Sequence, residues 1–423
     1  MTRSHCETKP RKRVARGNAF SKLSISSALE HLKPRRGNGL VQRLWVIVPV
    51  LATVLPGCGN AVPPTAAVPK TIIRSRHPSE IPKVIVLPRI PYGDGNLTPS
   101  AISASGGYVV GFGAGIPYDN GGARLQTFLW SEGKGHTEIP FPDESSSACT
   151  PDAVSDDGDE IVGGCAVGSA YEFGTVYSEK DGYVPLPAGV QDIVIGFGGE
   201  TRTYLGSGIV GETRRPIQVN GSEISELASM PASYTMGSTL EASADGGTVL
   251  VELNAYIPQD ESAEKRQPAS ERAILRVGAE PLYLSQLFPE QEIGEAGLSR
   301  NGAFLYGTHT KDDSTFLFAR NLRTGTMESI AVPADWAEVR ASCISDDGLI
   351  VFGGRAKGQG RRAFIWRIGI ALEDFEEYAS RRGLRILGWS VSEIVDCAAN
   401  GETFVATGVR RETRRPLWIK LPR

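Results

Sequence analysis

The chain has 423 residues, with 49 glycines, 27 prolines and a hydrophobic content of 40%, which suffices for a packed core and argues against global disorder. Its formal net charge of −3 hides an asymmetry, because residues 1–57 carry 11 Lys or Arg and only two acids, which leaves 34 basic and 46 acidic residues in 58–423. That net of −12 argues against a nucleic-acid partner, which requires clustered positive charge.

The first segment with a recognisable pattern resembles an export signal. Residues 1–43 are polar and basic, and Leu44–Leu55 is an apolar run of twelve residues interrupted by Pro49. A helix needs ~20 apolar residues to span a bilayer core, so this run has the length of a signal-peptide hydrophobic region instead. The basic preface is longer than such signals usually are, which is consistent with translation starting near Leu40 or Val41.

The apolar run ends at Leu55-Pro56-Gly57-Cys58, which resembles the lipobox of bacterial lipoproteins. The resemblance implies cleavage after Gly57 and lipid attachment to Cys58, whose thiolate is the nucleophile. Gly59, rather than Asp, follows, which implies sorting to the outer membrane, facing either the periplasm or the cell surface. A chance cysteine after an ordinary signal, or a buried apolar strand, is the alternative. We therefore expect residues 1–57 to be a basic preface and lipoprotein signal peptide, and residues 58–80, with four prolines, to be a Pro-rich linker.

Residues 81–423 are expected to form one repeat domain, because one hairpin phrase recurs along them. The phrase is a small-apolar-Ser strand, an Asp-Gly or Asn-Gly turn and an apolar strand that ends in Gly. Such turns close β-hairpins. The copies begin near residues 101, 153, 193, 242, 297, 343 and 397, about 49 residues apart on average. The third copy, at 193–206, is degenerate.

A second hairpin follows most copies, and its first strand is apolar or aromatic, as in Thr127–Trp130 and Ala363–Trp366. Four strands at this spacing are typical of a propeller blade. The fold class predicted is all-β, a β-propeller of seven four-stranded blades, with six blades or an open solenoid as alternatives. The last unit lacks a fourth strand, and residues 83–87 supply one that closes the ring. A short amphipathic helix is expected over 372–379.

The pattern Ala-x-Ser-x-Asp-Gly, Val-Val-Gly and Ala-Phe-x-Trp resembles the HAF-type probable extracellular repeat family of bacteria. The C-terminal run is similar as well, with acidic residues at 373–377, Gly388-Trp389, Asn400-Gly401 and a final strand into Leu421-Pro422. The resemblance covers about residues 98–423. It implies an exported β-propeller-like protein and no shared catalytic residues.

Four cysteines fall within the repeats. Cys149 and Cys165 are centred on the turn of the second hairpin, so they face each other across that ladder and are expected to form a disulfide in an oxidising compartment, with two free buried thiols as the alternative. Cys343 and Cys397 occupy the same position of adjacent repeats. They are expected to pack as small hydrophobic side chains, with a bridge between neighbouring blades as the alternative.

No pattern predicts a catalytic residue, a metal site or a cofactor. His77, His136 and His309 lack metal-ligand spacing. The acids between Asp152 and Asp159 do not match a calcium loop, and turn chemistry explains them better. Gly111–Gly115 leads into Ile116-Pro117 rather than a helix, so it is not a nucleotide loop. The pairs Arg214/Arg215, Arg361/Arg362 and Arg414/Arg415 are expected to be solvated turn charges, with an anion-binding rim as the alternative.

These patterns favour a non-enzymatic, lipid-anchored propeller that presents loops to an unknown protein or glycan at the cell envelope. We expect a monomer that contacts the membrane through Cys58. The alternatives are a propeller hydrolase or lyase acting on polysaccharide, and an outer-membrane assembly or scaffold lipoprotein. Convergent carboxylates or histidines in a deep polar channel would favour an enzyme, whereas a shallow, apolar, Gly-lined channel would favour binding.

Overall fold

The computed structural model describes residues 81–89, 97–117, 123–142, 146–167, 171–184, 186–197, 203–227, 234, 236–254, 270–276, 279–356, 359–386 and 388–422. All of them belong to one compact unit, Ile73–Arg423. The predicted signal peptide and linker, with Cys58 and His77, lie outside the described residues. Within the described part, no helix is long and apolar enough to cross a bilayer.

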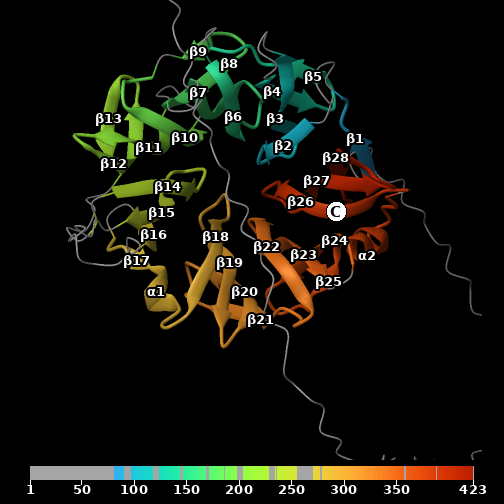
Figure 1. Cartoon of the computed structure of the whole chain (residues 1–423). Helices are drawn as coiled ribbons and strands as arrows, with labels where there is room; N and C mark the ends of the chain where they lie inside the picture. Colours follow the sequence, from blue (N-terminus) through green and yellow to red (C-terminus); the bar gives the residue numbers. More distant parts are fainter. Residues whose placement is uncertain are drawn as a thin grey trace, which may run out of the picture. The chain divides into compact units, whose positions relative to one another are not determined.

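The described residues form seven four-stranded antiparallel blades arranged in a ring (Figure 1). The first strand of each blade lies innermost and the others follow outward. Blades 1 and 2 are further joined by a parallel bridge between Leu125 and Ala148. The predicted seven-bladed propeller is confirmed, including the degenerate third repeat.

The first four blades each take four consecutive strands of the chain. Blade 1 contains β2 (Leu97–Ile102), β3 (Tyr108–Pro117), β4 (Ala123–Ser131) and β5 (Gly135–Glu138). Blade 2 contains β6 (Ser146–Val154), β7 (Glu160–Val167), β8 (Tyr171–Ser178) and β9 (Gly182–Val184). Blade 3 contains β10 (Val190–Phe197), β11 (Thr203–Val210), β12 (Thr213–Asn220) and β13 (Glu223–Glu226). Blade 4 contains β14 (Met236–Ala242), β15 (Thr248–Asn254), β16 (Ser270–Arg276) and β17 (Leu282–Tyr283).

The remaining blades follow the same plan, except that the last one takes its outer strand from the start of the domain. Blade 5 contains β18 (Glu292–Leu298), β19 (Phe304–Lys311), β20 (Ser314–Asn321) and β21 (Met327–Ala331). Blade 6 contains β22 (Trp336–Ile344), β23 (Leu349–Ala356), β24 (Arg361–Arg367) and β25 (Glu373–Asp374). Blade 7 contains β26 (Ser390–Cys397), β27 (Thr403–Arg410), β28 (Thr413–Lys420) and β1 (Lys83–Val86).

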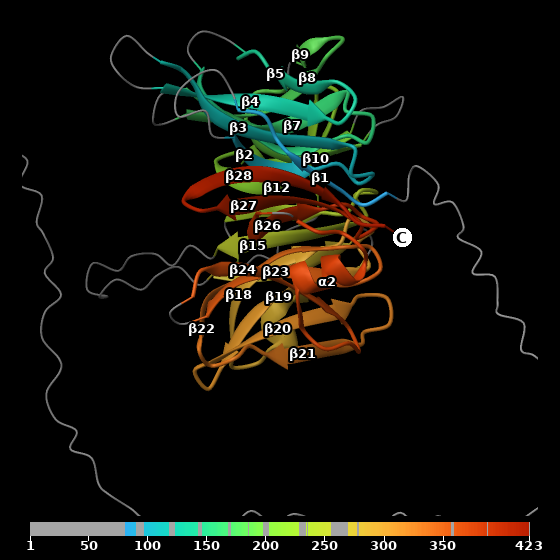
Figure 2. The same cartoon turned by 90° about the vertical axis from the view of Figure 1, so that its right-hand side faces the viewer.

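The two ends of the repeat domain meet in blade 7. Strand β1 pairs antiparallel with β28, and the Leu87 amide donates to the Pro416 carbonyl at 3.0 Å. Strand β2 of blade 1 packs against β26, β27 and β28 of blade 7. Figure 2 shows β1, β28 and β2 from the side. The N-terminal strand thus closes the ring, as predicted from the missing fourth strand.

In blades 2, 4, 5 and 6 the Asp-Gly or Asn-Gly turn is stabilised by the serine that precedes it. In blade 5 the buried Ser299 hydroxyl donates to Asn301 Oδ1 at 2.8 Å and accepts from the Phe304 amide at 2.9 Å. Gly302 completes the turn with φ of 63°, a conformation that glycine adopts without strain. Equivalent serines in blades 2, 4 and 6 make the same two bonds: Ser155, Ser243 and Ser345.

The first acid of the Asp-Asp-Gly turns links neighbouring blades. Asp156 Oδ1 accepts from the Ser105 amide at 2.6 Å, and Asp346 Oδ1 accepts from the Asn301 amide at 2.8 Å. The second acid acts within its own turn, since Asp157 Oδ1 accepts from the Asp159 amide at 3.0 Å. These acids therefore do the turn chemistry that the sequence predicts, and they also join adjacent blades.

Apolar clusters fill the spaces between adjacent blades, and two short helices complete them. Helix α2 (Phe375–Arg381) matches the predicted helix and buries Phe375 between blades 6 and 7. Asp374 caps it by accepting from the Glu376 amide at 2.9 Å. The single-turn helix α1 (Leu284–Leu287), which no sequence pattern indicates, buries Leu284 between blades 4 and 5.

A disulfide joins Cys149 and Cys165, the pair that the sequence predicts. The two residues lie directly opposite each other on β6 and β7, with their Cα atoms 4.1 Å apart.

Candidate functional site

Two neighbouring cavities form the candidate site, and the innermost strands supply most of their lining. The channel chamber has a volume of about 270 Å³ and the channel mouth about 600 Å³, and both are lined by Ser342 and Val395. The charged and aromatic residues of the chamber are Asp152, Glu241, Arg300, Tyr306 and Asp396. The charged residues of the mouth are Glu295, Arg340, Glu393, Arg414 and Arg415.

The two ends of the channel differ in what surrounds them. The channel mouth lies where the innermost strands begin, beside the turn between β27 and β28. We call this side the mouth face. The Asp-Gly and Asn-Gly turns, and the turns between third and fourth strands, lie at the opposite ends of the strands, and we call that side the turn face.

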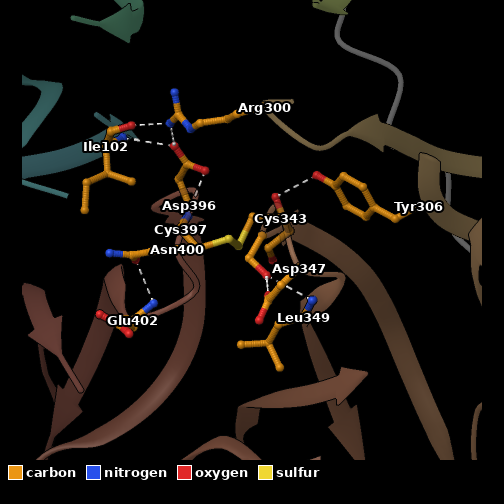
Figure 3. Close-up of a disulfide and its surroundings, with 12 residues drawn as sticks. Ile102, Arg300, Tyr306, Cys343, Asp347, Leu349, Asp396, Cys397, Asn400 and Glu402 are labelled. Carbon is orange, nitrogen blue, oxygen red and sulfur yellow. Dashed lines mark hydrogen bonds and ion pairs between the residues drawn. A yellow bond between two sulfur atoms is a disulfide. The ribbon is translucent and has the colours of Figure 1, made fainter. Parts of the chain in front are cut away.

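Arg300 links three blades at the chamber (Figure 3). It leaves the turn of blade 5, and its Nη2 donates to the Ile102 carbonyl of blade 1 and to Asp396 Oδ2 of blade 7, the latter at 3.2 Å. Both ionic side chains are 22% exposed. Because the pair is largely desolvated, each partner would be left as an uncompensated charge without the other.

Asp396 is held by donors on both oxygens. Besides Arg300, its Oδ2 accepts from the Ile102 amide at 2.9 Å, and its Oδ1 accepts from the Cys397 amide at 2.8 Å. Burial raises the pKa of Asp396, and Arg300 and the two amides oppose that shift. A carboxylate with both oxygens engaged in this way braces the ring, and it is poorly placed to accept a proton from a substrate.

Glu241 enters the same chamber from blade 4. Its Oε2 accepts from the Leu298 amide at 2.5 Å. The neighbouring Gly297 leaves the space that this contact needs, because a Cβ at that position would lie 2.5 Å from Glu241 Oε2 and 2.6 Å from the Tyr306 ring. Tyr306 donates its hydroxyl to the Ser342 carbonyl at 3.1 Å. Glycine at 297 therefore allows an acid and a tyrosine to meet in the chamber wall.

The chamber favours protonated acids. Burial raises the pKa of Glu241 to about 7, with a smaller upward contribution from Asp396. Although Asp152 is exposed to the chamber, desolvation by the surrounding chain raises its pKa to about 7, with Asp192 adding to it. The pKa of Tyr306 is raised well above its ordinary value, again mainly by burial. Near neutral pH the chamber thus gains negative charge as the pH rises.

A second disulfide, between Cys343 of β22 and Cys397 of β26, borders the chamber (Figure 3). The expectation that these cysteines pack as small hydrophobic side chains is wrong. Cys343 lies two residues before Ser345, whereas Cys397 directly precedes Ala398, the equivalent turn residue. Because successive side chains of a strand point to opposite sides, this one-residue offset turns the two sulfurs toward each other across the blade boundary.

The disulfide also bears on metal binding. Within the described residues, one group of side chains brings its sulfur and oxygen atoms close enough to share a metal ion: Cys343, Asp396 and Cys397. The thiolate is the form of cysteine that ligates metals, and the disulfide removes both. The remaining ligand, Asp396, is already bonded to Arg300. The oxidised site therefore supports no metal centre.

The arginine pairs singled out in the sequence are not equivalent. Arg214 pairs with Asp192 at 2.6 Å, and Arg362 pairs with Asp374 at 2.8 Å. Arg361 lies 3.5 Å from Glu393 and 3.7 Å from Glu338. For Arg414 and Arg415, which line the mouth, the described residues provide no carboxylate partner.

The histidines of the described chain do not come together. His136 lies on β5 of blade 1 against Phe128, and His309 lies on β19 of blade 5, stacked 5.0 Å from Phe316. Burial lowers the pKa of each. Both are packed side chains of their own blades, which agrees with the lack of ligand spacing in the sequence.

Sequence reasoning missed the chamber acids, although a signal was present. Glu241 and Asp396 stand two residues before the serine or alanine that opens the turn. In the other aligned repeats this position holds a small side chain or cysteine: Ala101, Ala153, Gly297 and Cys343. An acid at a position where the other repeats hold small residues marks a wall of the channel.

No family model matches the chain, and no curated protein matches its sequence. Three solved structures illustrate its structural similarities. The β-propeller domain of the Trilobed protease from Pyrococcus furiosus is 11% identical, with a TM-score of 0.44, over 66% of this chain and 83% of that one. An oligogalacturonate lyase from Vibrio parahaemolyticus is 8% identical, with a TM-score of 0.44, over 81% and 97%. TolB from Acinetobacter baumannii is 12% identical, with a TM-score of 0.35, over 75% and 81%. These similarities concern the fold and indicate no activity, substrate or partner.

Proposed function

We propose that this chain is a lipid-anchored β-propeller of the cell envelope that binds a partner at its channel mouth without catalysis. The observation that carries the proposal is the contrast between the two cavities. The mouth has about 600 Å³ and charged residues from blades 5, 6 and 7, whereas the chamber has about 270 Å³. Ligand pockets usually measure ~300–1,000 Å³, so the mouth has the size of a binding site and the chamber is marginal.

The hydrogen bonds that already occupy the chamber side chains also support a binding function. Asp396 and Arg300 are tied to blades 1, 5 and 7 by hydrogen bonds, and Tyr306 is bonded to a backbone carbonyl. Side chains used in this way hold the ring in one geometry. The mouth can then present a rigid surface to its partner, which reduces the ordering cost of binding.

A second candidate function, a hydrolase or lyase acting on polysaccharide, is favoured by the convergent carboxylates of the chamber, the feature expected of an enzyme from the sequence. Glu241 and Asp152 line the same chamber, and the pKa of each is about 7, a value suited to general acid or base catalysis near neutrality. This candidate requires that Glu241→Gln and Asp152→Asn each abolish polysaccharide cleavage by the purified protein. Absence of cleavage by the unaltered protein across neutral and acidic glycans would leave binding as the function.

The mouth can be tested by filling it. Thr98 is exposed and lines the mouth, so Thr98→Trp should occlude it and abolish crosslinking of the partner on intact cells. Thr324→Trp places the same side chain at an exposed position of the turn face and should leave the crosslinked species unchanged. Equal loss from both variants, or no loss from Thr98→Trp, would argue against the mouth as the binding site.

The proposed anchor gives an independent prediction. Cys58→Ser removes the thiol that receives the lipid, so it should abolish labelling by radioactive palmitate and release the protein from membranes into the soluble fraction. Cys6→Ser, upstream of the proposed cleavage site, serves as the control and should leave labelling unchanged. Continued labelling of the Cys58→Ser protein would rule out lipid attachment at this cysteine. The resemblance to the HAF-type repeat family supports export but not this particular anchor.

A further inference from the structure

The chain contains the pentapeptide Glu-Thr-Arg-Arg-Pro twice, at 212–216 and at 412–416. Each copy leads into the third strand of its blade, β12 or β28. The registers are the same, since Arg215 pairs with Gly208 and Arg415 pairs with Gly408. The two copies therefore place the same sequence in two different environments, which can be compared directly.

In blade 3 the first arginine is neutralised. Arg214 Nη2 lies 2.6 Å from Asp192 Oδ2, and Asp192 stands opposite Ser207 on the neighbouring strand. The two side chains are 33% and 26% exposed. In this copy the charge of Arg214 is therefore neutralised by an ordinary ion pair.

In blade 7 the equivalent acid is used elsewhere. Glu393 stands opposite Thr407, the position that corresponds to Asp192 opposite Ser207. Its Oε2 lies 3.5 Å from Arg361 of blade 6, and no ion pair joins it to Arg414 in the described residues. Arg414 is exposed at the channel mouth without a carboxylate partner there.

Three more arginines lie beside Arg414 and add to the positive charge at this edge of blade 7. A second cavity, of about 360 Å³, is lined by Trp389, Arg410, Arg411, Thr413 and Arg415. Arg415 lines both this cavity and the mouth. We call Arg410, Arg411, Arg414 and Arg415 the blade 7 arginine strip.

The strip carries uncompensated positive charge. Within the described residues, none of its four members forms an ion pair with a carboxylate. Burial, and secondarily the nearby Arg89, lowers the pKa of Arg415, as expected where cations are crowded and partly desolvated. Arg340, across the mouth, is only loosely compensated, with its Nε 3.6 Å from Glu295. Arginines held together in this way favour a bound anion.

We propose that the blade 7 arginine strip binds an acidic polysaccharide whose sugar rings carry carboxylates. Guanidinium groups bind carboxylates through paired hydrogen bonds, and the Trp389 wall suits the apolar face of a sugar ring. Two cavities that meet at Arg415 suit a ligand that extends over more than one ring. The inference rests on the proposed binding function and names the class of partner.

The test is calorimetric titration of the purified protein with alginate oligosaccharides, which carry a carboxylate on each ring. The double variant Arg411→Ala with Arg414→Ala should weaken binding about 100-fold or more, since each charge-assisted hydrogen bond accounts for roughly tenfold or more in affinity. Arg214→Ala removes the same side chain from the matching pentapeptide and should change the affinity less than about twofold, because that arginine is already paired. Arg415 is left intact because it also donates to the Leu87 carbonyl and supports the closing strand.

The other outcomes each decide against the proposal. Failure of alginate to bind, or equal losses in the blade 3 and blade 7 variants, would overturn it. Equally tight binding of neutral dextran would exclude charge recognition, and equally tight binding of inorganic phosphate would reduce the strip to a simple anion site. Tighter binding of single-stranded DNA would assign it to polyphosphates. If Thr98→Trp still abolishes partner crosslinking while alginate fails to bind, the mouth remains the binding site and only the ligand class is wrong.

Discussion

Deletion of residues 83–87 should unfold the propeller or leave it only marginally stable. These residues form β1 and the fully buried Leu87, and β1 supplies the fourth strand of blade 7. Val84 and Ile85 pack against two different apolar clusters. Full burial of Leu87 contributes about 1.5–3 kcal/mol, and the partly buried Val84 and Ile85 each add less, so their joint loss is a large fraction of the ~5–15 kcal/mol stability of a typical domain. The deletion also exposes the edge of β28, which favours aggregation.

Urea denaturation followed by circular dichroism measures this effect. Val86→Thr, an outward-facing change on the same strand, should alter the free energy of unfolding by less than about 0.5 kcal/mol. A synthetic peptide spanning residues 81–89 should restore part of the lost stability when added to the deletion variant, because it can pair with β28 again. A deletion variant with the unfolding midpoint of the intact domain would show that β1 does not close the ring.

Glu241→Gln should stabilise the protein at pH 8 and have little effect at pH 5. Burial raises the pKa of Glu241 from an ordinary value of 4.5 to about 7, so between these values the folded state holds a proton that the unfolded state releases. The stability associated with this proton is fully present below pH ~4.5 and is lost as the pH rises through ~7. At pH 8 the ionised Glu241 costs about 3 kcal/mol, and glutamine removes that cost while it still accepts from the Leu298 amide.

Chemical denaturation of both proteins at pH 5 and pH 8 tests the prediction. The lowered pKa values of His136 and His309 give a pH dependence of opposite sign, and it cancels when the variant is compared with the parent at each pH. Asp157→Asn serves as a control for an acid whose pKa is shifted in the opposite direction. Its pKa is lowered by the Ser155 hydroxyl and the Asp159 amide, so its loss should destabilise the protein at both pH values. Equal effects of Glu241→Gln at pH 5 and pH 8 would contradict the raised pKa.

The architecture is predictable from the sequence because it rests on local chemistry. A serine, a glycine with positive φ and an Asp or Asn between them define a turn whose hydrogen bonds span only a few residues, as at Ser299–Gly302. Four repeats carry this phrase in full, and the spacing of the three variant repeats completes the prediction of seven hairpins. The closing strand is predictable from a count of strands, because the last repeat lacks a fourth strand and one unassigned strand precedes the first repeat. The hairpin pairing of Cys149 with Cys165 is likewise local.

The site depends on contacts that no local pattern encodes. Asp396 bonds to Ile102, which lies 294 residues away in the chain, and Glu241 bonds to Leu298, 57 residues away. The Cys343–Cys397 disulfide depends on a one-residue offset between two inner strands, each of which has a register shift close to its cysteine. The different environments of Arg214 and Arg414 are also invisible in the pentapeptide, because Glu-Thr-Arg-Arg-Pro reads the same in both copies. In the structure Arg214 pairs with Asp192, whereas Glu393, at the corresponding position of blade 7, lies near Arg361 instead. The other two arginines of the strip, Arg410 and Arg411, are visible in the sequence, because the blade 3 copy has Val210 and Gly211 there.

The most direct test of the proposed function is to map the contact face on intact cells. A photoreactive amino acid is placed at Thr98 on the channel mouth or at Thr324 on the turn face, both of which are exposed. After illumination, crosslinked species are identified by electrophoresis and mass spectrometry. The proposal predicts one defined adduct from position 98 and none from position 324. An adduct from position 324 alone, or none from either position, would contradict a binding site at the channel mouth.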